Sequence, residues 1–136
     1  MQKQRLGWLG MAAFGLVLTA SQAAAEPWQP PRGGHTAEEY RRNATHWEMA
    51  FLALSVVDTV QSAECISHHR CREGNPLLGH HPSVGRLLLT RGVGDLAHYG
   101  IFRYLNARNP IQARSWAIGS TIVQGGVVAL NVRYAF

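Results

Sequence analysis

The chain has 136 residues, 46% of them hydrophobic, and carries 13 basic and 8 acidic side chains for a net charge of +5. This length allows one small domain, and the arginines are scattered without interleaved aromatic residues, which argues against a nucleic-acid groove. No nucleophile elbow, phosphate-binding loop or complete metal motif is present, so the familiar enzyme signatures are excluded.

The first segment has the layout of a secretory signal peptide. Lys3 and Arg5 precede an apolar run over residues 6–19, and three alanines end at Ala25 before Glu26. Small residues at this position suit signal peptidase, so residues 1–25 are predicted to be cleaved, leaving 111 residues. An uncleaved anchor helix is the alternative, although the run is short for a span of ~20 residues. We therefore expect export to the bacterial inner membrane or, alternatively, to the periplasm.

After the leader, residues 26–34 are rich in Pro and Gly and are predicted to form an extended tether. A helical domain over residues 35–136 follows. Thr36 and Glu39 have the spacing of a capping box, which predicts a helix start at this point. This helix is expected to run through Trp47 into the apolar stretch 49–60, with its polar first half at a surface.

Two further helices are predicted. Pro82 and Ser83 form a start signal for a helix over residues 84–105, residues 106–110 end it, and residues 111–131 form the third helix. Asn75 and Pro76 give another start signal, but Gly79 limits it to one turn. Strand-like alternation is confined to the last residues, so the expected fold is an all-α bundle of about three helices.

Membrane insertion is favoured by the third segment, since residues 115–132 carry no charge and are just long enough to span a bilayer. Its Gly119, Gly125 and Gly126 suit close helix packing in lipid. The second segment is less suited because it holds several charges, and the first has Asp58 near its centre. The prediction is a membrane-embedded bundle with lipid as its main partner. Two alternatives are a soluble periplasmic bundle and a small barrel, the latter suggested by the terminal Phe136.

Each apolar segment carries a polar stripe at helical spacing. The stripe consists of Asp58 and Gln61 in the first segment, Arg91, Asp95 and His98 in the second, and Gln124 and Asn131 in the third. Because each set shares one helix face, the three sets are expected to face inward together. Asp58 is predicted to bond Arg91 or Gln124, and His98 to bond Asn131 or Glu73. Arg91 and Asp95, four residues apart, can also pair with each other.

The stripe has two interpretations. Polar side chains inside apolar helices form either a satisfied polar core or a site for a metal or a proton relay. In the second case Asp58, Glu73 and His98 would be the ligands, and a metal-bound water could hydrolyse a lipid or an amide. We take the polar core as the prediction, with no catalytic residue and no cofactor, because the spacing of these three residues fits no fixed metal motif.

The motif Asp58-x-x-Gln61, then Glu73-x-Asn75-Pro76-Leu-Leu-Gly79-x-His81-Pro82-Ser83, then Gly94-x-x-x-His98, then Gln124 and Asn131, is similar to a family of small bacterial membrane proteins. It resembles the DUF5658-type group, which has an aspartate helix and a Glu-x-Asn-Pro loop. The likeness covers roughly residues 47–133. It implies a helical membrane-embedded domain and transfers no catalytic residue.

Cys65 and Cys71 are the two cysteines, and His68 and His69 lie between them. In an exported protein an even number of cysteines favours a disulfide. The alternatives are free thiols or a metal site with nearby histidines, although the spacing matches no known finger. A cleaved leader and a spanning first helix would place this pair in the reducing cytoplasm, so a disulfide and a spanning first helix exclude each other unless that helix is interfacial or re-entrant.

Two classes of function follow from these patterns. The first is a non-enzymatic accessory or scaffold module of the membrane, in which the loop 73–83 contacts a protein partner. The second is a membrane-embedded metal-dependent hydrolase or a transporter-like element that uses Asp58, Glu73 and His98. We favour the first, because the polar stripe is the only chemical signal and no complete catalytic motif accompanies it.

Overall fold

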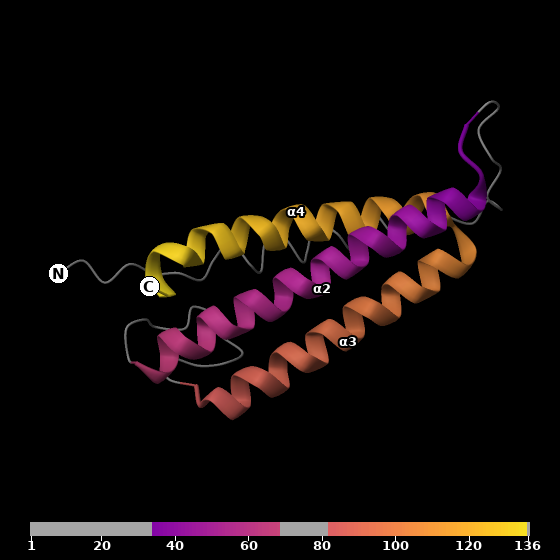
Figure 1. Cartoon of the computed structure of the whole chain (residues 1–136). Coiled ribbons are helices and arrows are strands. Elements are labelled where there is room, and N and C mark those ends of the chain that lie inside the picture. Colours follow the sequence, from indigo (N-terminus) through magenta and orange to yellow (C-terminus); the bar gives the residue numbers. More distant parts are fainter. Residues whose placement is uncertain (1–33, 69–81, 136) are drawn as a thin grey trace.

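The computed structural model describes residues 34–68 and 82–135, and within them the fold is a bundle of three long helices. Helix α2 comprises Ala37–Ser67, α3 comprises Val84–Arg108 and α4 comprises Pro110–Ala135 (Figure 1). The described residues contain no strand, so the predicted all-α class is confirmed. The predicted starts lie within one residue of those in the structure, while α3 and α4 continue three and four residues beyond their predicted ends.

The sequence signals for two helix starts act as expected. The hydroxyl of Thr36 accepts from the amide of Glu39, at 3.2 Å, and the Glu39 carboxylate accepts from the amide of Thr36, at 2.7 Å. The amide hydrogen bond from Thr36 lowers the pKa of this exposed carboxyl group, in a turn that precedes the apolar part of α2. Ser83 caps α3 in the same way, through the amide of Arg86. Local side chains therefore fix where these two helices begin.

A single residue, Asn109, connects α3 to α4. Its side-chain oxygen accepts from the amide of Gln112, at 3.2 Å, and Pro110 occupies the first position of α4. Asn at the cap and Pro at the first position form a start signal, which we had interpreted only as the end of α3. The connection is therefore a sharp corner.

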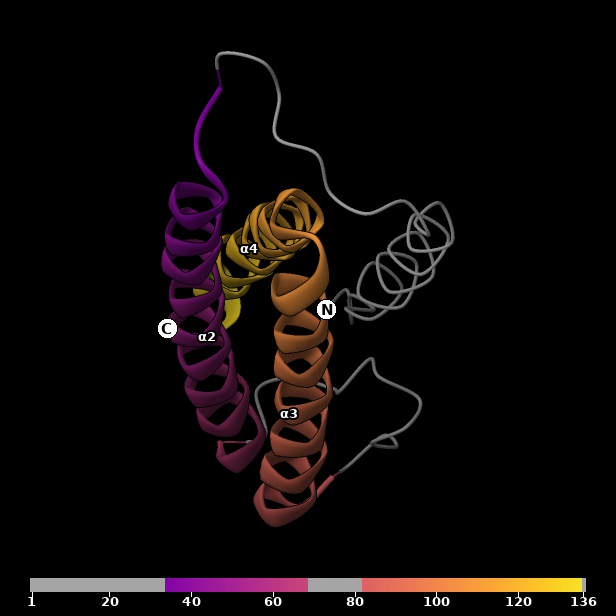
Figure 2. The ribbon, with the colours of Figure 1, turned by 90° about the vertical axis from the view of Figure 1, so that its right-hand side faces the viewer.

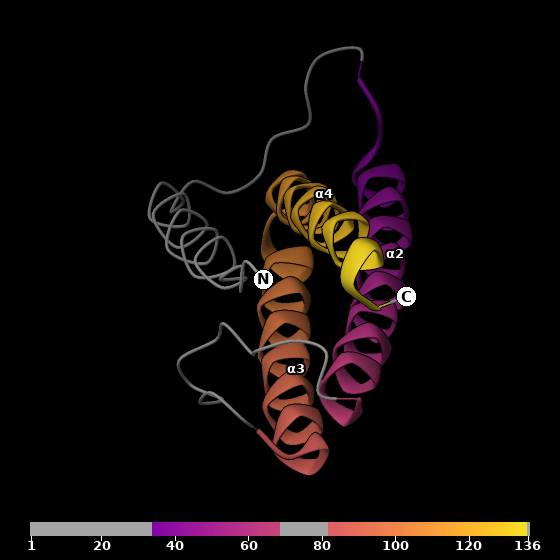
Figure 3. The same ribbon diagram turned by 90° about the vertical axis from the view of Figure 1, so that its left-hand side faces the viewer.

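The three helices do not lie parallel. Helices α2 and α3 run side by side in opposite directions, and α4 begins beside the start of α2 and diverges from α3 toward its own end (Figures 1, 2 and 3). The most extensive packing is between α2 and α4. The start of α2, the end of α3 and the start of α4 thus meet at one end of the bundle, which we call the arginine end after Arg41, Arg42, Arg103, Arg108 and Arg114.

Small side chains allow α4 to approach α2 closely. Ala113, Ala117 and Thr121 recur at every fourth residue of α4 and are buried. The Thr121 hydroxyl lies 2.7 Å from the carbonyl of Ala117 in its own helix and 2.9 Å from the carbonyl of Trp47 in α2. Such contacts with a neighbouring backbone require small residues at the crossing and are typical of helices that pack in lipid.

Of the three glycines expected to suit close helix packing, Gly125 takes part in the contact with α2. A Cβ atom at Gly125 would lie 3.6 Å from Leu54 of α2, whereas Cβ atoms at Gly119 and Gly126 would meet nothing within 4 Å. Within this bundle Gly119 and Gly126 make no close contact, because the helix face toward α2 is the one that carries the two alanines and Thr121.

The buried face of α2 is mainly polar. It follows a spacing of three and four residues along the whole helix and consists of Ala44, Glu48, Phe51, Ser55, Asp58, Gln61 and Cys65. The outer faces of all three helices carry large apolar side chains that are exposed, among them Val60 on α2, Leu96 on α3 and Ile122 on α4 at 62%, 73% and 65% exposure. A soluble bundle has the opposite distribution, with an apolar stripe inside and polar residues outside.

Candidate functional site

Asp58 joins all three helices at one point. Its side chain is fully buried, and the Arg91 guanidinium of α3 lies 2.6 Å from its Oδ2. From α4, the amide of Gln124 donates to the same oxygen at 3.1 Å, and the amide of Asn131 donates to Oδ1 at 2.7 Å. The expected partners Arg91 and Gln124 are therefore present, and Asn131 is added to them.

The charge of this carboxylate is balanced and its oxygens are occupied. A buried carboxylate without a partner would be very costly in an apolar helix bundle, whereas three donors and one positive charge make it tolerable. Arg91 is one-third exposed, so only one member of the ion pair is fully removed from solvent. The arrangement fixes the rotation of each helix, because turning any one of them would remove at least one of the donors to the carboxylate.

Asp95 of α3 contacts α2 separately. The Ser55 hydroxyl lies 2.8 Å from both carboxylate oxygens of Asp95. The expectation that Arg91 and Asp95 pair with each other does not describe the structure, because each is directed to a different residue on the buried face of α2. Two side chains one turn apart on α3 thus contact two side chains one turn apart on α2.

Toward the arginine end lies a second polar cluster, around His98 of α3. Its Nε2 atom lies 3.2 Å from Oε2 of Glu48 and 3.2 Å from Nε1 of Trp116. The ring of Phe51 stacks on the imidazole, with 3.8 Å between the centroids. Glu48 and His98 are both buried. His98 was expected to bond Asn131 or Glu73, and Asn131 instead bonds Asp58.

One ring nitrogen cannot serve both of its neighbours in the same protonation state. The Trp116 indole only donates, so it bonds Nε2 when that atom carries a lone pair. A carboxylate at Glu48 only accepts, so it bonds Nε2 when that atom carries a proton. Nε2 can therefore form only one of these two hydrogen bonds in any one tautomer.

The remaining predicted residues are divided between described and undescribed parts of the chain. Gln61 is buried on α2, and its Oε1 atom has no hydrogen-bond partner. Cys65, near the end of α2, is buried and disulfide-bonded. Its expected partner Cys71 lies outside the described residues, as does the predicted loop with Glu73, Asn75 and Pro76, so these expectations stay predictions.

Sequence reasoning missed Glu48, Ser55 and Trp116. The spacing offered a signal for the first two, since Ser55 lies three residues and Glu48 ten residues before Asp58 on the same helix face. We had instead assigned the region of Glu48 to a polar surface. Trp116 had no comparable signal, because its role depends on how α4 crosses α3.

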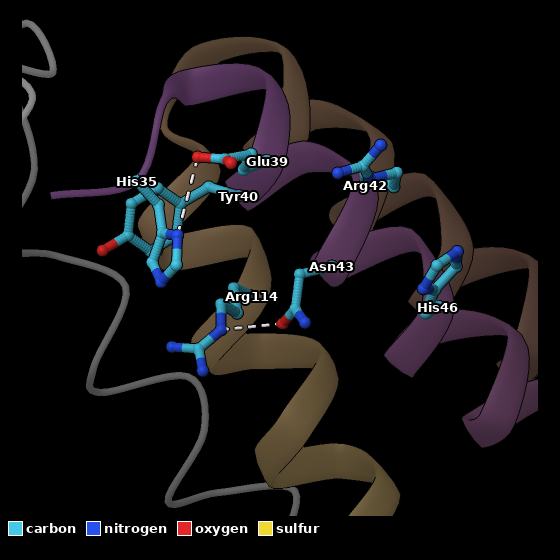
Figure 4. Close-up of a pocket in the computed structure, with 7 residues that line it drawn as sticks. All are labelled: His35, Glu39, Tyr40, Arg42, Asn43, His46 and Arg114. Carbon is cyan, nitrogen blue, oxygen red and sulfur yellow. Dashed lines mark hydrogen bonds and ion pairs between the residues drawn. The ribbon is translucent and has the colours of Figure 1, made fainter.

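A pocket lined by polar side chains lies at the surface of the arginine end. It has a volume of about 460 Å³ and is lined by the first turns of α2 and by Arg114 of α4. Figure 4 shows Arg114 directed toward Asn43, whose side-chain oxygen accepts from it at 2.8 Å, and His35 beside Glu39. The α2 side chains that line it are mostly exposed, so this pocket contains no desolvated chemical group.

A metal centre finds no support in this arrangement. Among residues 34–68 and 82–132, no group of three or more His, Cys, Asp or Glu side chains could hold a metal ion. Asp58 and His98, two of the three proposed ligands, belong to separate clusters with different partners. No protein-family model matches the sequence, and comparisons with curated proteins and with solved structures give no significant match. The resemblance to the DUF5658-type group therefore stays a prediction.

Proposed function

We propose that the protein is a non-enzymatic accessory or scaffold module of the bacterial inner membrane. Its apolar outer faces contact lipid, and its polar side chains hold the helices together from inside. The chain then provides a rigid, charge-containing helical unit beside which a protein partner can assemble, and the loop 73–83 offers the contact.

The observation that carries this proposal is the inverted distribution of polarity. Two helices, α2 and α4, contain stretches long and apolar enough to cross a membrane. Only 28% and 11% of these stretches are buried within the bundle, whereas a core helix of a soluble protein would be mostly buried. Exposed apolar surface on this scale is costly in water and favourable in lipid.

Helix α3 is less apolar than the other two and does not qualify as a membrane span by composition. The inward pairing of its charged side chains explains how it can still lie beside α2 and α4. Arg91 and Asp95 are directed inward to Asp58 and Ser55, while Leu88, Leu89 and Leu96 are exposed. Charged groups inside membranes face the bundle interior and pair there. The charges of α3 near its ends, Arg86 and Arg103, can extend to the membrane surface.

The hydrogen bonds of the carboxylates of Asp58 and Asp95 support a non-enzymatic role. The carboxylate of Asp58 is occupied by three donors, and that of Asp95 by Ser55. A catalytic acid or ligand needs a free position for substrate, which these groups do not offer. They orient helices, in agreement with the modest strength of about 0.6 kcal/mol per inter-helix hydrogen bond.

A fractionation experiment tests the proposal. The full chain with a C-terminal tag is expressed in bacteria, and the membranes are washed with alkaline carbonate and with urea. We expect the protein to remain in the membrane pellet, and the mass of the purified protein tells whether residues 1–25 have been removed. Retention of a processed chain would assign anchoring to the helical domain. Release into the wash would contradict the proposal and favour the soluble periplasmic bundle.

The disulfide of Cys65 supports one orientation of the bundle in the membrane. A structural disulfide persists in the oxidising periplasm and not in the cytoplasm, so we place the end of α2 on the periplasmic side. A spanning α2 then begins in the cytoplasm, with the arginine end there, which agrees with the preference of cytoplasmic loops for arginine. This orientation requires that Glu26 is not exported, so it predicts a retained chain that still carries residues 1–25. Retention of a processed chain would contradict the orientation and would leave the membrane location intact.

A further inference from the structure

We propose that a groove between α2 and α3 at the arginine end binds the headgroup of an aminophospholipid, with the ammonium group held by Glu48 and Asn106 and the phosphate by Arg41 and Arg103. The groove has a volume of about 290 Å³, and these four residues are part of its lining. The inference rests on the proposed membrane location, and it adds a ligand to a module that otherwise only packs.

Two acceptors in the lining lack donors. Oε2 of Glu48 contacts His98, but Oε1 has no hydrogen-bond partner although the side chain is only 1% exposed. Oδ1 of Asn106 is also buried without a partner. Buried oxygens of this kind normally have partners, because leaving one unsatisfied costs about 1–3 kcal/mol. A primary ammonium group carries three donors and a positive charge, which suits one carboxylate oxygen and one amide oxygen.

The same lining also contains positively charged groups for the phosphate of the ligand. Arg41 uses its Nε–H on the carbonyl of Asn106, at 3.3 Å, which leaves its terminal nitrogens for another group. Arg103 is exposed and makes one long hydrogen bond, of 3.4 Å, to the hydroxyl of Tyr99. Two guanidinium groups next to a buried carboxylate match a zwitterion with a phosphate and an amine, since guanidinium groups favour phosphate oxygens.

A lipid is favoured over a free metabolite by the surroundings of the groove. Met49 belongs to the lining and is 60% exposed, so apolar surface continues from the groove along α2. The groove lies where α2 begins and α3 ends, the level at which headgroups meet a bundle whose apolar part is in the bilayer. Phosphatidylethanolamine supplies phosphate, ammonium and acyl chains in one molecule.

Competition between two lipids tests the proposal. The full chain is purified in detergent, equal amounts of dioleoyl phosphatidylethanolamine and dioleoyl phosphatidylcholine are added, and bound lipids are counted by native mass spectrometry. Phosphatidylcholine has the same phosphate and chains, but its methylated amine cannot donate. A charged hydrogen bond to Glu48 predicts a preference of roughly tenfold for phosphatidylethanolamine. Equal occupancy by the two lipids would overturn the proposal.

Variants assign the roles of the residues. Glu48→Gln and Asn106→Leu should each reduce the preference. Asn106→Leu serves even if the first variant folds poorly, because the Asn106 Oδ1 atom has no hydrogen-bond partner that the substitution would remove. The double variant Arg41→Gln with Arg103→Gln should reduce binding of both lipids. Arg42→Gln, an exposed neighbour outside the groove, is the control and should change neither. A full preference in both Glu48→Gln and Asn106→Leu would overturn the assignment.

Two further measurements separate the sources of failure. Phosphoethanolamine without acyl chains should not displace the lipid at millimolar concentration, and displacement would mean that the site takes the headgroup alone. Each variant is also washed with carbonate as above. A variant that stays in the membrane without lipid preference contradicts the site and leaves the proposed function intact, whereas wild-type protein released by carbonate contradicts both.

Discussion

Asp58 of α2 and Arg91 of α3 form an ion pair of 2.6 Å in which the carboxylate is fully buried and the guanidinium is one-third exposed. The pair lies where α2 also faces Gln124 and Asn131 of α4. A single carboxylate therefore couples the rotation of three helices. Its loss should damage the assembly of the bundle far more than the loss of an exposed charge.

We predict opposite outcomes for two substitutions of Asp58. Asp58→Asn keeps the shape and one acceptor oxygen, so the variant should accumulate to near the wild-type level. Asp58→Leu leaves Arg91 and two amides without their acceptor, and breaking a buried pair in this way costs about 3–5 kcal/mol. Its abundance in membranes, measured by quantitative blotting of a C-terminal tag, should fall severalfold. Normal accumulation of Asp58→Leu would show that the pair is not required.

A double substitution separates the charge from the packing. Arg91→Leu alone should be as harmful as Asp58→Leu, because it leaves a buried carboxylate without its counter-charge. Asp58→Leu combined with Arg91→Leu should recover part of the abundance, since removing both members of a buried pair is often neutral while removing one is costly. Arg108→Leu, at an exposed position, is the control. Strictly additive losses would argue against direct coupling of the two residues.

Ser55→Ala is predicted to destabilise the contact between α2 and α3. The hydroxyl is the donor to Asp95, and losing a hydrogen bond to a charged group costs about 1.5–3 kcal/mol. Thermal unfolding in detergent should begin at a lower temperature. Ser67→Ala is the matched control, because the Ser67 hydroxyl bonds within its own helix at an exposed position. Equal unfolding temperatures for the two variants would refute a stabilising role of the Ser55 bond.

Ala117→Leu is predicted to push α4 away from α2. Ala117 is fully buried at the crossing, and adding a larger side chain to a packed contact costs about 1–3 kcal/mol or more. Ala129→Leu, an exposed position on the same helix, should be neutral. Protease resistance of the purified variants distinguishes them. If Ala117→Leu were as resistant as Ala129→Leu, the close α2–α4 contact would be wrong.

Much of the fold could be predicted from local signals. The capping box at Thr36 and Glu39 and the cap at Ser83 depend on side chains within three residues, so the sequence alone identifies both starts. The end of α3 was placed too early, because the corner at Asn109 depends on a cap for the next helix. The approach of α4 to α2 could not be derived, since helical periodicity does not tell which small residues meet another helix.

The candidate site was only partly predictable for the same physical reason. Helical spacing identified Asp58, Arg91 and Gln124 as inward residues, and they do meet. Helical spacing does not determine how far one helix is shifted along its axis relative to another. Asn131 was therefore assigned to His98, although it bonds Asp58. Glu48 was overlooked because it lies in the polar first half of the helix, which was assigned to a surface, whereas the structure buries it against His98.

Labelling of outward positions in native membranes tests the central claim most directly. Val60→Cys and Ile122→Cys are made in a chain whose two native cysteines are replaced by serine, with Arg42→Cys as the control at the bundle end. All three positions are exposed in the isolated bundle. In membrane fragments open on both sides, a water-soluble maleimide should modify only Arg42→Cys, and the other two should react only after denaturation. Modification of Val60→Cys and Ile122→Cys as fast as Arg42→Cys would contradict a lipid-embedded bundle.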